Sequence, residues 1–152
     1  MELTSLYRSK LTTPADAVGR IASGATLSMG MAMNEPPALL KALADRAAAG
    51  TVNDLKIYYF ESTPIAGETI LRYELTDRIH PYCMFVTAVE RALIKRGMAD
   101  GGRKVLTYVP SNFSQSWTLA CSSAVCLCNL ILCPLASRQV APAGLVEKGV
   151  PA

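Results

Sequence analysis

The sequence lacks concentrated charge of either sign. Its 15 lysines and arginines and 12 acidic residues leave a formal net charge of +3, and basic residues such as Lys10, Arg20 and Lys41 occur singly. A nucleic-acid-binding surface requires basic residues gathered into a patch or stripe, so we expect no nucleic-acid partner. The N-terminal segment also lacks the apolar core of a signal peptide, which makes a cytoplasmic location the default expectation.

The sequence also lacks the common motifs for binding a nucleotide or activating a nucleophile. Gly24 and Gly30 form neither a G-x-G-x-x-G nor a Walker A motif. The single histidine, His80, has no serine or cysteine nucleophile in a recognisable elbow beside it, so we interpret it as structural. Glu61 and Glu68 are interpreted as solvated surface charges. We therefore assign no catalytic residue to this chain.

The five cysteines do not form a disulfide or metal-binding pattern for the main body of the chain. Four of them lie between Cys121 and Cys133, without the Cys-x2-Cys spacing of common zinc sites and without nearby charged groups to orient them. We expect reduced thiols and no metal. The uncharged stretch 117–136 is just long enough to span a bilayer, but polar residues and a proline dilute it, and we expect no membrane span.

Residues 26–50 form the most informative stretch of the sequence. Leu27, Met29 and Met31 alternate with Ser28 and Gly30, a spacing that predicts a buried strand followed by a glycine-containing turn. Asn34 is a suitable helix cap, and the two prolines after Glu35 fit a first helical turn. Leucines at helical spacing then predict a helix over 36–49, ended by glycine at position 50.

The rest of the main body alternates between helical and extended patterns. A capping box at Thr13 and Asp16 predicts a helix that glycine at position 24 ends, and a second box at Thr87 and Glu90 predicts another, ended by Gly97. Strands are expected at 55–60, 78–83 and 105–109, and a short helix at 68–73. Strand–helix–strand units with short connections predict parallel pairing. The fold class is therefore α/β, a mostly parallel sheet with flanking helices.

Ligands of such sheets bind at the carboxyl ends of the strands, so the turn after the first strand and the hydroxyl-bearing loops after later strands could contact a ligand. Gly30 and Asn34 bound the turn after the first strand, and the hydroxyl-bearing Ser62, Thr63 and Thr87 follow later strands. The hydroxyls are hydrogen-bond donors for a carboxylate or carbonyl oxygen. The alternative is that they satisfy backbone groups locally and that the glycine only permits close packing.

Past Gln115 the character of the sequence changes, because charge and clean periodicity both disappear between Trp117 and Ala136. We expect residues 1–115 to form a truncated α/β domain and residues 116–152 to form an irregular, cysteine-rich tail. Such an abrupt change is typical of a divergent terminus or of an out-of-frame end to the reading.

An ordered set of motifs gives residues 7–115 a family resemblance. The segments YRSKLTTPADAVGRIASGATLSMGMAMNEPPALLKALADR, LKIYYFEST, FVTAVERALIKRGMAD and YVPSNFSQ follow one another in the chain. In this order they resemble the N-terminal domain of the acetyl-CoA hydrolase/transferase family, whose members are CoA-transferases acting on short acyl-CoAs.

The resemblance implies two related α/β domains and an acyl group that passes through a glutamyl-CoA thioester. That glutamate would lie in a second domain, beyond the length of this chain. The resemblance further implies that Gly30, Asn34, Ser62, Thr63 and Thr87 line the acyl side of the cleft. Coenzyme A would be a substrate, with no cofactor bound, and the partners would be acyl-CoA and short carboxylates. Homo-oligomer formation stays open.

Two alternative functions remain. One is a non-catalytic α/β domain that binds a nucleotide or sugar phosphate, and the other is a protein anchored to a membrane by its tail.

Overall fold

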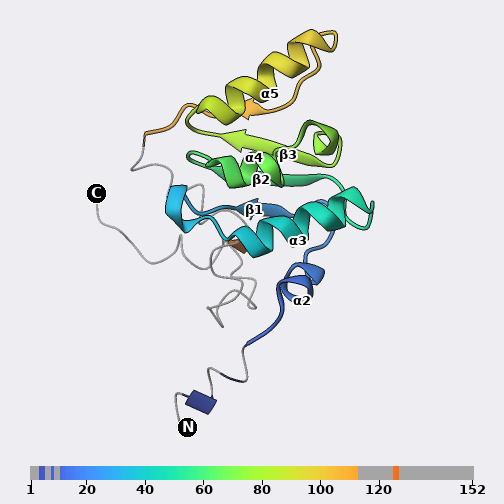
Figure 1. Ribbon diagram of the computed structural model, residues 1–152, viewed down its shortest axis with the longest axis vertical. Helices are drawn as coiled ribbons and strands as arrows, with labels where there is room; N and C mark the ends of the chain where they lie inside the picture. The colour runs from blue at the N-terminus through green and yellow to red at the C-terminus, as the bar shows by residue number, and fades with distance from the viewer. Residues whose placement is uncertain (1–3, 6–7, 9–10, 113–124, 127–152) are drawn as a thin grey trace, which may run out of the picture.

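The computed structural model describes residues 4–5, 8, 11–112 and 125–126 (Figure 1). The short segments 4–5 and 8 are helical. The elements that follow are, in chain order, α2 (Pro14–Gly19), β1 (Thr26–Ser28), η1 (Ala32–Asn34), α3 (Pro37–Ala48), β2 (Leu55–Tyr59), α4 (Pro64–Glu68), η2 (Tyr73–Leu75), β3 (Ile79–Cys83), α5 (Ala88–Ala99), β4 (Thr107–Tyr108) and β5 (Val125–Cys126).

The centre of the fold is an all-parallel sheet. Strands β1 to β4 pair in chain order, and β5 pairs in parallel with the free side of β1, which gives the order β4-β3-β2-β1-β5. Each step from β1 to β4 crosses over through helical segments, as parallel pairing requires. The expected α/β class with a parallel sheet and flanking helices is confirmed.

The three crossover segments place α3, α4 and α5 on the same face of the sheet (Figure 1), as right-handed connections in one direction require. Burial alternates accordingly along β2 and β3. Leu55, Ile57 and Ile79 are fully buried beneath the helices, whereas Tyr58 and Tyr82 on the opposite face are half-buried and stack with ring centroids 4.5 Å apart. The hydrophobic core therefore lies between the sheet and the helical layer.

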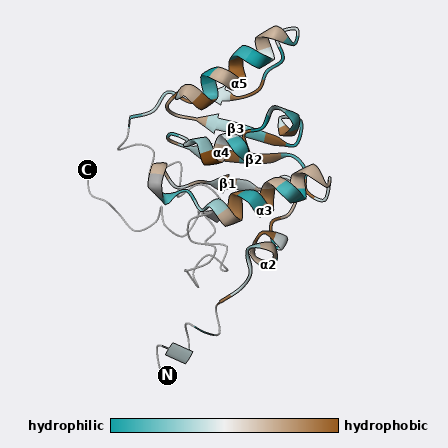
Figure 2. Ribbon diagram, viewed as in Figure 1, coloured by the Kyte–Doolittle hydropathy of each residue, from teal (hydrophilic) through white to brown (hydrophobic). Residues whose placement is uncertain are grey.

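Helix α3 supplies much of this core, because Leu39, Leu40 and Leu43 are all buried. Figure 2 shows hydrophobic and hydrophilic bands along the same helix, as expected for an amphipathic helix on a sheet. Its predicted start was wrong in detail. Asn34 ends the 3-10 turn η1, and the N-cap of α3 is Pro36, which makes no side-chain capping bond.

The two predicted capping boxes mark real helix starts, but both predicted stops were wrong. The Thr13 hydroxyl accepts a hydrogen bond from the Asp16 N–H at 3.1 Å, and α2 ends at Gly19, five residues before position 24. Helix α5 continues through Gly97 to Ala99. Gly97 is needed for packing, since a Cβ there would lie 2.6 Å from the Arg103 carbonyl oxygen.

Other expected elements are present with altered bounds. The helix expected at 68–73 is replaced by the short α4 before it and the 3-10 turn η2 after it. Strand β4 contains only Thr107 and Tyr108. Pro81 lies inside β3, where it offers no N–H; this position is tolerated because β3 pairs with β4 only from Tyr82 onward.

Part of the segment expected as an irregular tail belongs to the sheet, since β5 comes from residues 125–126. The rest of 116–152, including the other residues of the stretch considered as a membrane span, lies outside the described residues. Within the described part of the chain, no helix combines the length and apolar character needed to cross a bilayer.

Replacing Leu43 with alanine should lower the free energy of unfolding by about 2–5 kcal/mol, because the side chain is fully buried and its removal leaves a cavity. Urea denaturation followed by circular dichroism measures this change. Lys41→Ala, on the exposed side of the same helix, is the matched control and should change the free energy by less than about 0.5 kcal/mol. Equal effects of the two substitutions would contradict the assignment of Leu43 to the core.

Candidate functional site

The loops that follow β1, β2 and β3 meet at the carboxyl edge of the sheet, because the three strands are parallel neighbours. The turn η1, which follows β1, lies at this edge in Figure 1. Hydrogen bonds tie the later two loops to each other and to the segment that precedes α3. This edge therefore brings together the residues that the sequence selected as a binding site.

Ser62 and Thr87 meet at a buried carboxylate. The Ser62 hydroxyl donates to Glu90 Oε1 at 2.5 Å, while Thr87 donates to Glu90 Oε2 through its N–H at 2.8 Å and its hydroxyl at 2.5 Å. Glu90 is completely buried in the first turn of α5. The negative charge lies at a helix N-terminus, where the helix dipole stabilises it.

Thr63 is bound in the same way by a second carboxylate from another part of the chain. Its N–H donates to Glu35 Oε1 at 2.8 Å, and its hydroxyl donates to Glu35 Oε2 at 2.5 Å. Glu35 is only 5% exposed and lies between η1 and α3. The Thr63 hydroxyl also accepts from the Ile65 N–H as the N-cap of α4.

Gly30 and Asn34 lie in one tight turn beside this cluster. A Cβ on Gly30 would lie 2.9 Å from the carbonyl carbon of Asn34, so the turn has no room for a side chain there. Asn34 is exposed and directly precedes Glu35. The structure thus places Gly30 and Asn34 next to the residue that binds Thr63.

Two aromatic rings and a free carboxylate complete the edge. Phe60 and Phe85 stack with nearly parallel planes, their centroids 6.3 Å apart, and Phe85 is 54% exposed. Glu61 is half-buried, and its side chain makes no hydrogen bond or ion pair with any residue that the structure describes. The edge therefore presents an apolar wall and one unpaired carboxylate beside the bound hydroxyls.

Two further groups at this edge are kept in their neutral forms. Burial, followed by the negative charge of Glu90, raises the pKa of the Tyr59 hydroxyl far above its ordinary value. Burial, again with the charge of Glu90, raises the pKa of the Cys83 thiol to about 11. A thiol must ionise to act as a nucleophile, so Cys83 is a packing residue.

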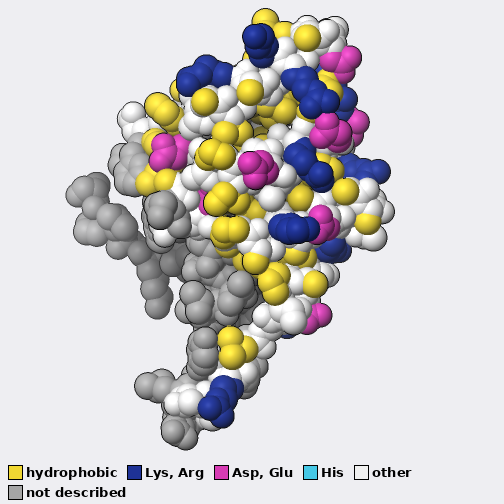
Figure 3. All heavy atoms as spheres, in the orientation of Figure 1, with side chains coloured by type: hydrophobic (Ala, Val, Ile, Leu, Met, Phe, Trp, Pro, Cys, Tyr) yellow, Lys and Arg dark blue, Asp and Glu magenta, His cyan; other side chains and the backbone are white. Residues whose placement is uncertain are grey.

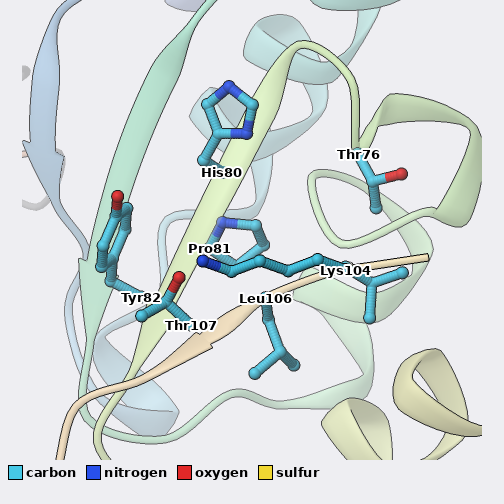
Figure 4. Close-up of a pocket in the computed structure, with 8 residues that line it drawn as sticks. Thr76, His80, Pro81, Tyr82, Lys104, Leu106 and Thr107 are labelled. Atoms are coloured by element: carbon cyan, nitrogen blue, oxygen red, sulfur yellow. The ribbon is translucent and has the colours of Figure 1, made fainter. Parts of the chain in front are cut away.

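A separate hollow of about 120 Å³, which none of the bound hydroxyls lines, lies near β3 and β4 (Figure 4). His80, Tyr82 and Lys104 line it, together with Thr76, Pro81, Val105, Leu106 and Thr107. The His80 Nε2 lies 3.2 Å from Asp54 Oδ1 at the start of β2. This contact links the end of the loop before β2 to β3.

Charged side chains are interspersed on the face shown in Figure 3 and form no single basic patch. A hollow of about 300 Å³ between α5 and the α4–η2 segment is lined partly by Arg96, which lies over the Tyr73 ring and pairs with Glu74 at 2.8 Å. Among the described residues, no group of three or more histidine, cysteine or acidic side chains is arranged to hold a metal ion.

The two buried glutamates are the residues that the sequence analysis did not place in the site. The capping-box pattern did identify Glu90 as a partner of Thr87, but nothing in that pattern indicates that it also binds Ser62. Glu35 precedes two prolines and carries no motif. Glu68 is exposed as expected, whereas Glu61 is half-buried at the edge of the site.

The Cys83 thiol should resist alkylation by iodoacetamide at about pH 8 in the folded protein, because it is buried and its pKa is raised. Peptide mass spectrometry after timed labelling measures the reaction. The same thiol should react rapidly in urea. Since the unfolded chain ionises at lower pH than the folded one, this thiol also lowers stability as pH rises from about 9 towards 11. Rapid labelling without denaturant would contradict the assignment.

No family model matches the sequence, and no curated protein matches it. The chain is similar to solved structures of RipA. The crystal structure of RipA from Yersinia pestis matches with a TM-score of 0.77 and 66% sequence identity, over 80% of this chain and 28% of RipA. The F60M and E61V variants of RipA each match at 65% identity with a TM-score of 0.77 and the same coverage. This chain, which spans less than a third of RipA, carries phenylalanine and glutamate at those same two numbers.

Proposed function

We propose that this chain is the first part of an acyl-CoA:carboxylate CoA-transferase or acyl-CoA hydrolase, and that it shapes the acyl side of the cleft. The observation that carries the proposal is the arrangement of Phe60 and Glu61. Both lie at the carboxyl edge of a parallel sheet, beside an exposed aromatic ring. RipA, which shares this fold at 66% identity, has structures of variants altered at a phenylalanine and a glutamate with the same numbers.

The chemistry of the edge suits the uncharged end of an acyl-CoA. Phe60 and Phe85 offer an apolar surface of the kind that an acyl chain buries. The hydroxyls of Ser62 and Thr63 hold the loop in place, since each donates a hydrogen bond to a glutamate carboxylate. Their part in the reaction is positioning, which contributes to catalysis by holding reactants in the required geometry.

The reaction proposed for the whole enzyme needs a nucleophile that this chain does not supply. By the resemblance, a glutamate carboxylate of a second domain attacks the thioester carbonyl, which releases CoA thiolate and forms a mixed anhydride. The thiolate then attacks the glutamyl carbonyl, which gives glutamyl-CoA and frees the acyl group as a carboxylate. This chain binds and orients the acyl group during those steps.

The alternative of a nucleotide- or sugar-phosphate-binding domain is less well supported. Phosphates bind to free N–H groups at helix N-termini. Here the N–H groups of Thr63 and Thr87, at the starts of α4 and α5, already donate to Glu35 and Glu90. The two negative charges also repel a phosphate.

The 152-residue chain alone should show no CoA exchange between acetyl-CoA and succinate above background, because the nucleophile lies outside it. A chimera in which residues 1–112 replace the aligned segment of RipA should show exchange, as should RipA itself. Release of succinyl-CoA, measured by liquid chromatography, follows the reaction. Inactive RipA, or a folded but inactive chimera beside active RipA, would contradict the proposal. Turnover by the chain alone would show that the nucleophile lies within it.

In the chimera, Phe85→Ala should lower kcat/KM about three- to tenfold, because it removes an exposed ring that stacks on Phe60. Met98→Ala is the matched control: it removes a side chain that is 73% exposed near the end of α5 and should leave kcat/KM unchanged. Steady-state kinetics with acetyl-CoA provides the comparison. If both variants keep full activity, the aromatic pair does not form part of the acyl site.

A further inference from the structure

The segment that leaves β2 is fixed at both ends. At its start, the carbonyl oxygens of Tyr59 and Phe60 accept hydrogen bonds from the Met84 and Phe85 N–H groups at 3.1 and 2.8 Å. At its end, Ser62 and Thr63 donate to the two buried glutamates. The backbone between these anchors carries the side chains of Phe60 and Glu61, which are the two positions central to the proposed site.

The two glutamates that bind this segment come from different parts of the fold. Glu35 precedes α3 and reaches Thr63, whereas Glu90 projects from α5 and reaches Ser62. Each carboxylate also accepts a backbone N–H, at Thr63 for Glu35 and at Thr87 for Glu90, with a distance of 2.8 Å in both cases. Both oxygens of each carboxylate therefore accept hydrogen bonds, which fixes each carboxylate relative to the loop.

Neither glutamate forms an ion pair with a residue that the structure describes. Burying a carboxylate without a cation is unfavourable unless hydrogen bonds replace its water shell. Here neutral hydroxyl and N–H donors supply those bonds. An apolar side chain would fill the same space without this desolvation, so packing alone does not account for glutamate at both positions.

We propose that Glu35 and Glu90 are positioning residues that hold Ser62 and Thr63 so that Phe60 and Glu61 face the acyl site in a fixed direction. The effect of this on turnover rests on the proposed function; the effect on the geometry of the loop does not. The required property is the length of each side chain, because the carboxylate must reach the hydroxyl across a fixed distance from the backbone that carries the glutamate.

Two substitutions at each glutamate distinguish the effect of side-chain length from the effect of negative charge. Gln keeps the length of Glu and retains a carbonyl oxygen that accepts one of its hydrogen bonds. Asp keeps the charge but is shorter by one carbon–carbon bond, about 1.5 Å. A positioning role therefore predicts that Glu35→Asp and Glu90→Asp are more harmful than Glu35→Gln and Glu90→Gln, whereas an electrostatic role predicts the reverse order. Glu68→Gln, at an exposed position of α4, is the control for loss of charge.

The loop geometry is measured first, in the 152-residue chain, by amide hydrogen exchange and backbone NMR. Exchange at the Thr63 N–H should accelerate about tenfold or more in Glu35→Asp, and exchange at the Thr87 N–H should do so in Glu90→Asp. The amide chemical shifts of Phe60 and Glu61 should move in both Asp variants and stay near their original values in the Gln variants and in Glu68→Gln. Unchanged Phe60 and Glu61 shifts in both Asp variants, with the fold retained, would overturn the proposal.

The kinetic test uses the active chimera well below its unfolding temperature, so that lost stability does not imitate lost activity. The Asp variants should lower kcat/KM for acetyl-CoA about tenfold or more, with the Gln variants within about threefold of the parent. Losses that are equal in Asp and Gln variants, or that follow the unfolding temperature alone, would reduce the glutamates to structural residues. An inactive wild-type chimera would count against the proposed function, and the NMR result would still decide the positioning role.

Discussion

Two buried carboxylates, whose partners among the described residues are hydroxyls and N–H groups and not cations, hold the carboxyl edge of this sheet together. Glu90 joins the loop after β2 to the start of α5, and Glu35 joins the same loop to the start of α3. The two helices belong to different crossovers, and these hydrogen bonds connect the residues at their N-termini through the same loop. Removing one donor leaves a charge buried without a full set of partners, which is strongly unfavourable.

Much of the sheet could be predicted from the sequence, and the reason is local. The β-branched and aromatic run that became β2 and the capping box that became the start of α5 both depend on neighbouring residues, and both are where the patterns indicate. Helix ends were less predictable. The sequence pattern predicts that α5 ends at Gly97, but the helix continues through it. Glycine is required there because the Arg103 carbonyl oxygen approaches too closely for a side chain, a contact that no local pattern contains.

The position of the candidate site could be predicted from the sequence, but the hydrogen bonds between its residues could not. The rule that ligands bind at the carboxyl ends of parallel strands selected Ser62, Thr63 and Thr87. The pairing of Ser62 with Glu90 and of Thr63 with Glu35 spans 28 positions of sequence in each case. Such a pairing depends on the stacking of α3, α4 and α5 over the sheet, which only the folded chain defines.

The pairing of β5 with β1 has a consequence for how the chain folds as it is synthesised. Strands β1 to β4 pair with neighbours in sequence, so they can assemble early, whereas β5 contributes a contact of long sequence separation that forms late. Until residue 125 has left the ribosome, one side of β1 is an unpaired strand edge, a surface prone to pairing with other chains. The nascent domain therefore passes through a stage in which β1, an inner strand of the finished sheet, is still an edge strand, and a chaperone would have most to protect during that interval.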